Sequence, residues 1–115
     1  KKQRQRMNVI LFNQLTDFMK LHLNHISIQM LTQEFHFYED YFNRLLKTQT
    51  GMTYIEYLQM LRLERAELLL TETNNTIEQI AEEVGYHNKG YFYRIFIERN
   101  NCTPAQYRKK RQERL

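Results

Sequence analysis

The chain of 115 residues is 42% hydrophobic and 26% charged, and it carries a net charge of +4 at pH 7. This balance excludes a disordered polar tail, and no apolar run approaches the ~20 residues of a membrane span. The single cysteine excludes an internal disulfide and fits a reducing compartment such as the cytoplasm, while three glycines and one proline are few for a sheet protein. We therefore expect an all-α protein with no membrane partner, built as one domain or two very small ones.

The first half of the chain is expected to hold three helices. Residues 1–7 are polar and basic, and we interpret them as a linker to a preceding domain. Apolar residues three or four apart then predict a helix over residues 8–23. A second helix follows the capping residue Ser27, and a third ends at Gly51 after a break at residues 36–38.

The second half is expected to hold four more helices. The longest spans residues 53–72, where apolar residues recur at helical steps. A shorter helix follows Thr76 and is broken at Gly85. An aromatic-rich helix then runs to about Arg99, and Thr103-Pro104 is typical of the cap and first position of a short last helix.

Charge is distributed unevenly over these elements. Residues 1–26 carry five basic and one acidic residue, residues 27–100 carry seven basic and eleven acidic, and residues 101–115 carry five basic and one acidic. A simple polycation that coats DNA or a membrane is therefore not expected. If the protein binds nucleic acid, a few specifically positioned residues in the middle segment must make the contacts, and the basic ends must assist them.

An internal repeat with an offset of about 50 residues relates the two halves. Ser27-Ile28-x-x-Leu31 aligns with Thr76-Ile77-x-x-Ile80, and Tyr41-Phe42-x-Arg44-x-Leu46 aligns with Tyr91-Phe92-x-Arg94-x-Phe96. Each copy is a helix, a tight turn and a second helix, which is a helix-turn-helix. Gly85 can supply a positive φ in the second turn, whereas His36 stands there in the first copy, so we expect that turn to differ in shape.

These patterns predict seven helices that form two helix-turn-helix subdomains joined by a long linker helix. The expected boundaries are 1–7 for the basic linker, 8–52 for the first subdomain, 53–72 for the linker helix and 73–115 for the second subdomain. The large rings of Phe42, Phe92 and Phe96 are expected in the cores, because small subdomains gain most from burying large side chains.

Two stretches carry a resemblance to a known family, namely YFNRLLKTQTGMTYIEYLQMLRLERAELLL and TIEQIAEEVGYHNKGYFYRIFIERNNCTPAQYR. They resemble the DNA-binding domain of the AraC/XylS family of bacterial transcription regulators, over about residues 7–110. The resemblance implies that each subdomain places its second helix in a major groove of double-stranded DNA, with no cofactor. Asn101 stands where the family has glycine, and asparagine tolerates the left-handed conformation of that turn.

The resemblance and the helical phase together suggest which residues contact DNA. In the first copy these are Asp40, Asn43, Arg44 and Lys47, and in the second they are Asn88, Lys89, Gly90, Tyr91, Tyr93 and Arg94. Arg99 is a further candidate on the same side. We hypothesise that the first copy discriminates between sequences, through Asn43 to adenine and Arg44 to guanine, and that the second mostly holds the phosphates. Two alternatives to DNA contact stay open. Arg44 and Arg94 could instead pair with acidic neighbours. Glu39 and Asp40 could instead interact favourably with the dipole at the start of their helix.

An enzyme is not expected. The four histidines show no metal-ligand spacing, the one cysteine completes no zinc site, and no glycine-rich phosphate loop occurs. The competing function is a helical protein-binding module that contacts RNA polymerase or a partner subunit, and the basic tail over residues 108–114 suits either function. We expect the isolated domain to bind its DNA site as a monomer.

Overall fold

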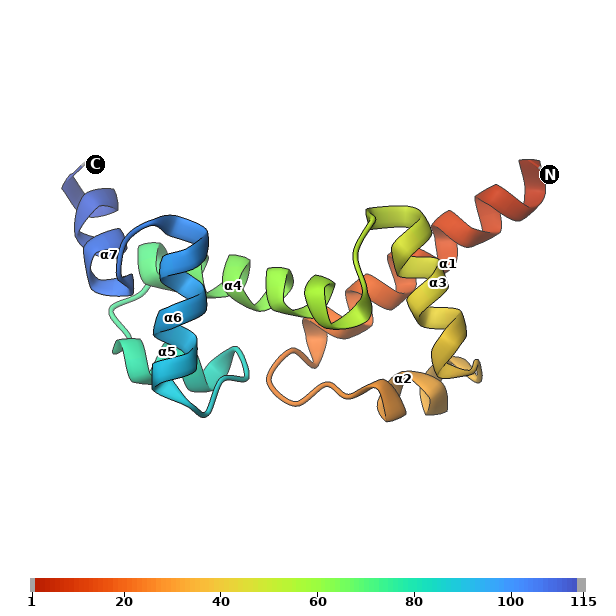
Figure 1. The fold of residues 1–115 in the computed structure, drawn as a ribbon, viewed down its shortest axis with the longest axis horizontal. Helices are drawn as coiled ribbons and strands as arrows, with labels where there is room; N and C mark the ends of the chain where they lie inside the picture. Colours follow the sequence, from red (N-terminus) through yellow and green to blue (C-terminus); the bar gives the residue numbers. More distant parts are fainter. Residues whose placement is uncertain (1, 114–115) are drawn as a thin grey trace. The chain divides into compact units, whose positions relative to one another are not determined.

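The computed structural model describes residues 2–113, with side chains from residue 5 onward. The expected all-α fold with seven helices is confirmed within this range (Figure 1). The helices are α1 (Lys2–Leu21), α2 (Ile28–Phe35), α3 (Glu39–Thr50), α4 (Tyr54–Glu72), α5 (Ile77–Glu83), α6 (Lys89–Asn100) and α7 (Pro104–Glu113). No described helix has both the length and the apolar content needed to cross a bilayer.

The first helix begins earlier than expected. Residues 2–7, which we expected to form part of a linker, are the first turns of α1. Their glutamine, arginine, lysine and methionine residues are good helix formers with no glycine or proline among them, so nothing in this stretch stops the helix. Its role as a connection to a preceding domain remains a prediction.

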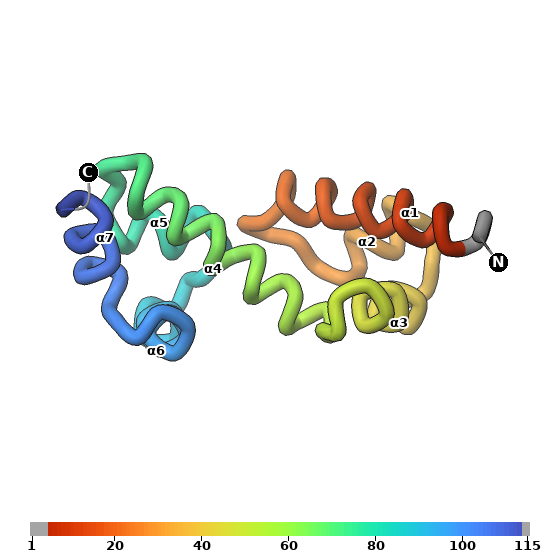
Figure 2. Tube along the Cα trace, turned by 90° about the horizontal axis from the view of Figure 1, so that it is seen from above, coloured from red at the N-terminus to blue at the C-terminus, as the bar shows by residue number. Residues whose placement is uncertain are grey.

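Two compact units divide the chain, a first unit up to Met60 and a second unit from Leu61. In the first unit, α3 packs against both α1 and α2; in the second, α6 packs against both α5 and α7 (Figure 1 and Figure 2). Each unit buries a small core that includes the expected aromatic rings: Phe42, Phe92 and Phe96 are fully buried.

The first part of helix α4 contributes to the core of the first unit, and the later part contributes to the core of the second. In the first unit the hydroxyls of Tyr57 and Thr16 lie 3.1 Å apart in the interior, and the ring of Tyr57 also contacts Phe12. In the second unit Leu63 and Ala66 belong to the buried cluster that contains the α6 side chains. The segment expected as a separate linker over 53–72 is therefore also a core element.

Side-chain caps fix where several helices begin. Ser27 caps α2 as expected, with its hydroxyl accepting a hydrogen bond from the backbone of Met30 at 3.3 Å. Thr76 starts α5 with a complete capping box, because its hydroxyl and the Gln79 side chain satisfy each other's backbone N–H groups. Thr103 and Gln106 form the same reciprocal pair at the start of α7.

The turns of the two helix-turn-helix units differ, as the sequence predicts. Gly85 has φ +104°, and the backbone N–H groups of Gly85 and Tyr86 bond back to Glu82 and Ala81, which is a Schellman motif. In the first unit His36 takes φ +60° and donates only to Thr32, the simpler left-handed ending. Histidine thus adopts the left-handed conformation there without the tighter turn that glycine permits.

The second helix of each unit ends in the same way. Gly51 after α3 has φ +77° and Asn101 after α6 has φ +58°, and the backbone N–H of each bonds to the carbonyl four residues before it. The expectation that asparagine replaces glycine at this position without loss of the turn is confirmed.

Candidate nucleic-acid interface

Helix α6 presents one buried and one exposed face. Its apolar side chains Phe92, Ile95 and Phe96 are buried in the second unit, which fixes the rotation of the helix. The helix begins at the capping residue Asn88, whose side-chain oxygen accepts a hydrogen bond from the backbone N–H of Tyr91 at 3.0 Å. Asn88, predicted as a DNA contact, therefore has a structural role that orders the first turn of α6.

The structure brings most of the predicted residues of the second unit together on this exposed face. The exposed positions are Asn88, Lys89, Gly90, Tyr91 and Arg94, and Tyr93 is half-buried beside them. Gly90 leaves the surface between Lys89 and Arg94 without a side chain, so a ligand there meets the helix backbone. This face combines two basic groups, tyrosine hydroxyls and an accessible backbone, all of which are groups that contact nucleic acid.

Arg94 is held by an aromatic ring. Its guanidinium carbon lies 5.1 Å from the centre of the Tyr91 ring, one turn earlier on α6. Among the described residues, no carboxylate lies within ion-pairing distance of Arg94 or of Arg44. The alternative in which these two arginines pair with acidic neighbours therefore finds no support in the described part of the chain.

Lys89 and His87, at the start of α6, each face a carboxylate of α5. The ammonium of Lys89 lies 3.4 Å from the carboxylate of Glu78, and Nδ1 of His87 lies 2.8 Å from that of Glu82. A hydrogen bond from its own backbone and the nearby Lys89 ammonium hold the pKa of Glu78 below its usual value. Sequence inspection missed these contacts, although Glu78 and Glu82 lie one turn apart on α5 and so share a face.

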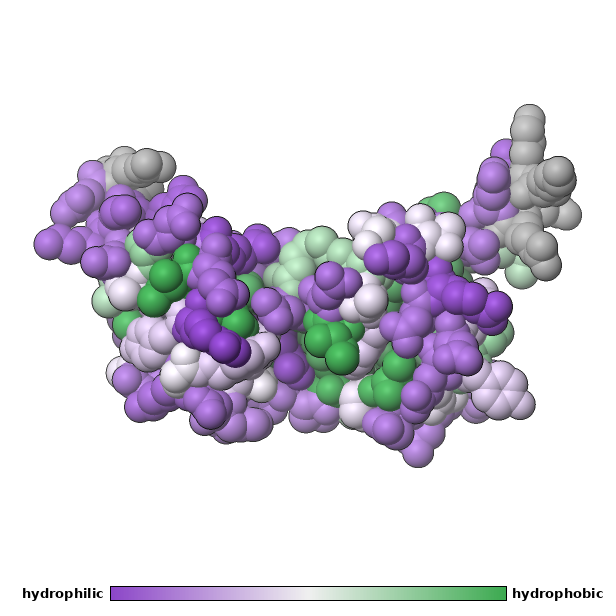
Figure 3. Space-filling view, in the orientation of Figure 1, coloured by the Kyte–Doolittle hydropathy of each residue, from purple (hydrophilic) through white to green (hydrophobic). Residues whose placement is uncertain are grey.

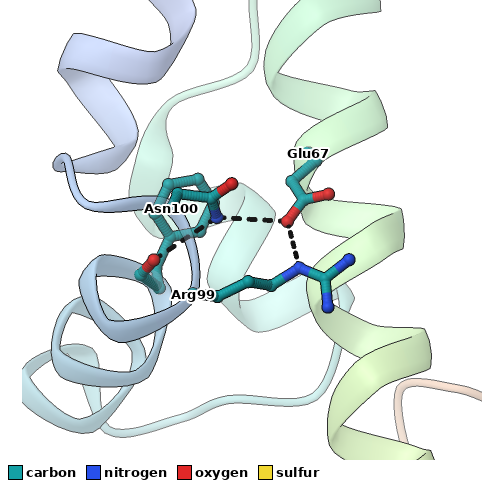
Figure 4. Close-up of polar contacts among 4 residues, drawn as sticks. Glu67, Arg99 and Asn100 are labelled. Carbon is teal, nitrogen blue, oxygen red and sulfur yellow. Dashed lines mark hydrogen bonds and ion pairs between the residues drawn. The ribbon is translucent and has the colours of Figure 1, made fainter.

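Arg99, the further candidate, pairs with a carboxylate of another helix. Its Nε donates to Glu67 of α4 at 2.6 Å, and the amide nitrogen of Asn100 donates to the same carboxylate oxygen at 3.1 Å (Figure 4). Glu67 is mostly buried, with 16% of its side chain exposed, so this group anchors the end of α6 to α4. The charge of Arg99 therefore has a partner within the second unit, unlike that of Arg94 among the described residues.

Helix α3 of the first unit presents a comparable but more mixed face. Phe42, Leu45 and Leu46 are buried, while Asp40, Arg44 and Lys47 are exposed as predicted. Unlike α6, the helix starts without a side-chain cap and carries Glu39 and Asp40 in its first turn, where carboxylates are favoured by the helix dipole.

The side chain of Asn43 is less exposed than we predicted for a DNA contact. It is half-buried, and its side-chain oxygen accepts a hydrogen bond from the backbone N–H of Tyr54 at 3.1 Å. A bidentate contact to adenine needs both the oxygen and the nitrogen of the amide, so the predicted contact would compete with the one that holds the start of α4. Helical phase alone could not reveal this, because Tyr54 belongs to another helix.

An aromatic group before and within α3 escaped the sequence interpretation. The rings of Phe37 and Tyr41 stack with their centres 4.4 Å apart, and Tyr38 between them in sequence is 89% exposed. The spacing of four residues between Phe37 and Tyr41 was the available signal. The equivalent rings of Tyr86 and Tyr91 lie 5.8 Å apart and are tilted by 56°, so both helices have an aromatic entry and the one at α3 is stacked.

The basic tail is partly structural. In α7, Arg108 donates to the backbone carbonyls of Leu70 and Thr73 at 3.0 and 3.2 Å, which satisfies groups at the end of α4. The guanidinium of Arg111 lies over the ring of Tyr107. Arg114 lies outside the described residues. Of the tail, Lys109 and Lys110 are exposed.

Metal-ligating side chains do not cluster in the part of the chain that the structure describes, and no group of three or more occurs there. On the face seen in Figure 3, hydrophilic side chains cover most of each unit and apolar ones show between them.

Comparison with known proteins gives consistent results. The family model described as "Helix-turn-helix domain" matches residues 31–110. The transcriptional activator RhaR of Mannheimia succiniciproducens is 43% identical over 67 residues, which are 58% of this chain and 24% of that protein. This chain therefore spans about a quarter of that relative's length.

Solved structures agree on the fold. A transcriptional regulator from Chromobacterium violaceum, described as containing an AraC-type DNA-binding domain, is 26% identical with a TM-score of 0.77, and the match covers 84% of this chain and 87% of that one. The DNA-binding domain of AdpA, solved with a target DNA, is 19% identical with a TM-score of 0.80 over 89% of this chain and 93% of its own.

Proposed function

This chain belongs to the AraC-type helix-turn-helix family of transcription regulators, and from that premise we propose that it binds double-stranded DNA sequence-specifically to regulate transcription. The observation that carries the proposal is the exposed face of α6. There Arg94 is ordered against Tyr91 and has no carboxylate partner among the described residues, on a helix fixed by a buried opposite face. Such a site would operate on bacterial chromosomal DNA in the cytoplasm.

The chemistry of α6 suits a helix that enters the major groove. A major groove admits an α-helix, and a guanidinium that reaches a base edge pairs in two places with guanine. Stacking on Tyr91 reduces the number of conformations that Arg94 must give up on binding. Tyr93, Lys89 and the exposed backbone near Gly90 would then contact phosphates, which position the helix without reading sequence.

For α3 we propose a different division of roles. Arg44 is the residue suited to guanine, Lys47 the residue suited to phosphate, and Asp40 the residue suited to the amino group of cytosine. Asn43 supports the site by holding the start of α4, and only its amide nitrogen remains to contact a base. The supporting observation is that Arg44, Lys47 and Asp40 are exposed, whereas Asn43 is half-buried.

We further propose that one chain reads two successive segments of the major groove. The chain carries two helix-turn-helix units, and α4, with 19 residues, runs from one into the other. Hydroxyl-radical footprinting is expected to show two protected segments about one turn, ~34 Å, apart with one chain bound per duplex. A single protected segment, or binding that requires two chains in sedimentation, would contradict this.

The test of DNA binding begins with a random duplex, because no operator needs to be known. Fluorescence anisotropy at about 50 and about 200 mM salt should show an affinity that falls steeply with salt, as expected when lysine and arginine displace counterions. A module that binds only proteins, such as RNA polymerase, would show no affinity for the duplex at either salt concentration.

Sequence specificity is tested by selecting binding sites from a random library. The wild-type protein should enrich a defined motif, and Arg94→Ala should relax it at about one position at a cost of ~1–3 kcal/mol. Arg65→Ala is the matched control, because Arg65 is also exposed and basic but lies on α4. An unchanged motif with Arg94→Ala, or an equal change with Arg65→Ala, would remove Arg94 from the reading face.

A further inference from the structure

The start of α6 is bordered by two carboxylates of α5. Glu78 and Glu82 lie one turn apart on α5, and they face Lys89 at 3.4 Å and His87 at 2.8 Å. Lys89 is the first residue of α6, the helix that carries the proposed reading face. An acidic side chain of the protein therefore already contacts a lysine that DNA phosphates would contact.

The first unit has no such arrangement. At the positions equivalent to Glu78 and Glu82 in the internal repeat it has Gln29 and Gln33, and its second helix starts with Glu39 where α6 starts with Lys89. The helix-turn-helix of the first unit forms without these ion pairs. A helix-turn-helix unit can therefore form without carboxylates at these two positions.

The geometry points to a role in DNA binding, and this inference rests on the function proposed above. We propose that the Glu78 carboxylate substitutes for a DNA phosphate in the free protein, so that DNA must displace it from Lys89. The protein thereby weakens its sequence-independent affinity, and base contacts on α3 and α6 contribute a larger share of the total. Glu78 is a specificity-determining residue that never contacts a base.

The exposure of the pair makes the exchange feasible. The side chains of Lys89 and Glu78 are 59% and 49% exposed, so phosphate can reach the ammonium without any movement of the backbone. Exposed ion pairs are weak, so the pair should reduce DNA affinity by a modest factor rather than block binding. Phosphate contacts contribute mainly to sequence-independent binding, so this is where the effect should appear.

A double-mutant cycle on a random duplex tests the exchange. The variants are Glu78→Gln, Lys89→Gln and the double variant, measured by anisotropy at low salt with circular dichroism to confirm folding. Glu78→Gln should tighten binding about two- to fivefold, the range expected for an exposed pair. In the Lys89→Gln background the same change should have no effect, because the lysine that Glu78 engages is gone.

Two controls separate the pair from general charge effects. Glu72→Gln removes the same charge from an exposed position at the end of α4, and it should change affinity by less than Glu78→Gln does. Lys89→Gln alone should weaken binding by less than Arg94→Gln, since Lys89 only exchanges one anion for another. This second comparison keeps the test valid if Glu78→Gln proves to be poorly folded.

The outcomes distinguish this inference from the proposed function. If the wild-type protein shows no salt-dependent binding, the proposed function fails. If it binds but Glu78→Gln has no effect, or tightens binding equally with and without Lys89, only the inference fails, because the second result would reflect simple repulsion of DNA by Glu78.

Discussion

Replacing Gly85 with alanine tests the turn of the second helix-turn-helix and the residue that packs against it. Gly85 has φ +104°, and a Cβ there would lie 2.8 Å from Cζ of Arg62 and 2.9 Å from its Nε and Nη2. The same guanidinium lies 5.5 Å from the centre of the Tyr86 ring. The added methyl group would therefore strain the backbone and also displace Arg62 from the turn.

Gly51 provides a matched comparison within the same chain. It also has a left-handed φ, +77°, but a Cβ there would meet nothing within 4 Å. We expect Gly51→Ala to show the backbone cost alone, ~1 kcal/mol. Gly85→Ala adds the loss of the contact between Arg62 and Tyr86, for a total of ~2–3 kcal/mol.

Urea unfolding followed by circular dichroism would measure both costs as changes in the free energy of unfolding. Arg62→Ala creates space next to Gly85, so in that background the cost of Gly85→Ala should fall to its backbone cost alone. A cost for Gly85→Ala no greater than for Gly51→Ala would refute the contact argument. An equal cost with and without Arg62 would show that only the backbone is responsible.

Four further changes have defined outcomes. Glu67→Gln should lower the free energy of unfolding by ~1–2 kcal/mol in urea titration, because Arg99 loses a charged acceptor and Asn100 its shared oxygen; an unchanged midpoint would show that the anchor is dispensable. Thr76→Ala should cost ~0.5–2 kcal/mol through the lost capping box, whereas Thr76→Ser should cost little. Asn43→Ala should lower the thermal midpoint, because the backbone N–H of Tyr54 loses its partner; a loss of cognate DNA affinity at unchanged stability would restore the base-reading role. Burial raises the pKa of Tyr86 to about 12 although the charge of Arg62 opposes the rise, so the free energy of unfolding should fall as pH rises from about 10 to about 12. Tyr86→Phe should lose less stability over this pH range, and an identical loss would show that Tyr86 does not cause it.

Much of the fold could be predicted because local signals agree with it. Thr76, Thr103 and Gly51 mark helix ends by side-chain capping or by positive φ, and both effects depend on neighbouring residues only. The apolar spacing of Phe92 and Phe96 fixed the buried face of α6. The start of α1 was missed because polar residues that favour helix formation resemble a linker when no apolar pattern accompanies them.

The candidate site was predictable only in part, because exposure and partners are set by other helices. Helical phase correctly placed Arg44 and Arg94 on exposed faces. It could not show that Arg99 pairs with Glu67, 32 positions away, or that Asn43 bonds to the backbone of Tyr54. Pairing between polar groups far apart in the sequence leaves no periodic pattern, so the roles of Arg99 and Asn43 in the structure differ from those we predicted.

The sharing of α4 between the two cores limits how the protein can be taken apart. Leu63, Ala66, Leu69 and Leu70 of this helix are part of the buried cluster of the second unit. A transplant of the second unit onto another protein would therefore have to include α4 from Leu61 onward. A graft beginning at Thr76 would leave Ile80, Val84 and Phe92 without the surface they pack on. The smallest portable module is thus defined by its packing partners and extends beyond the helix-turn-helix motif itself.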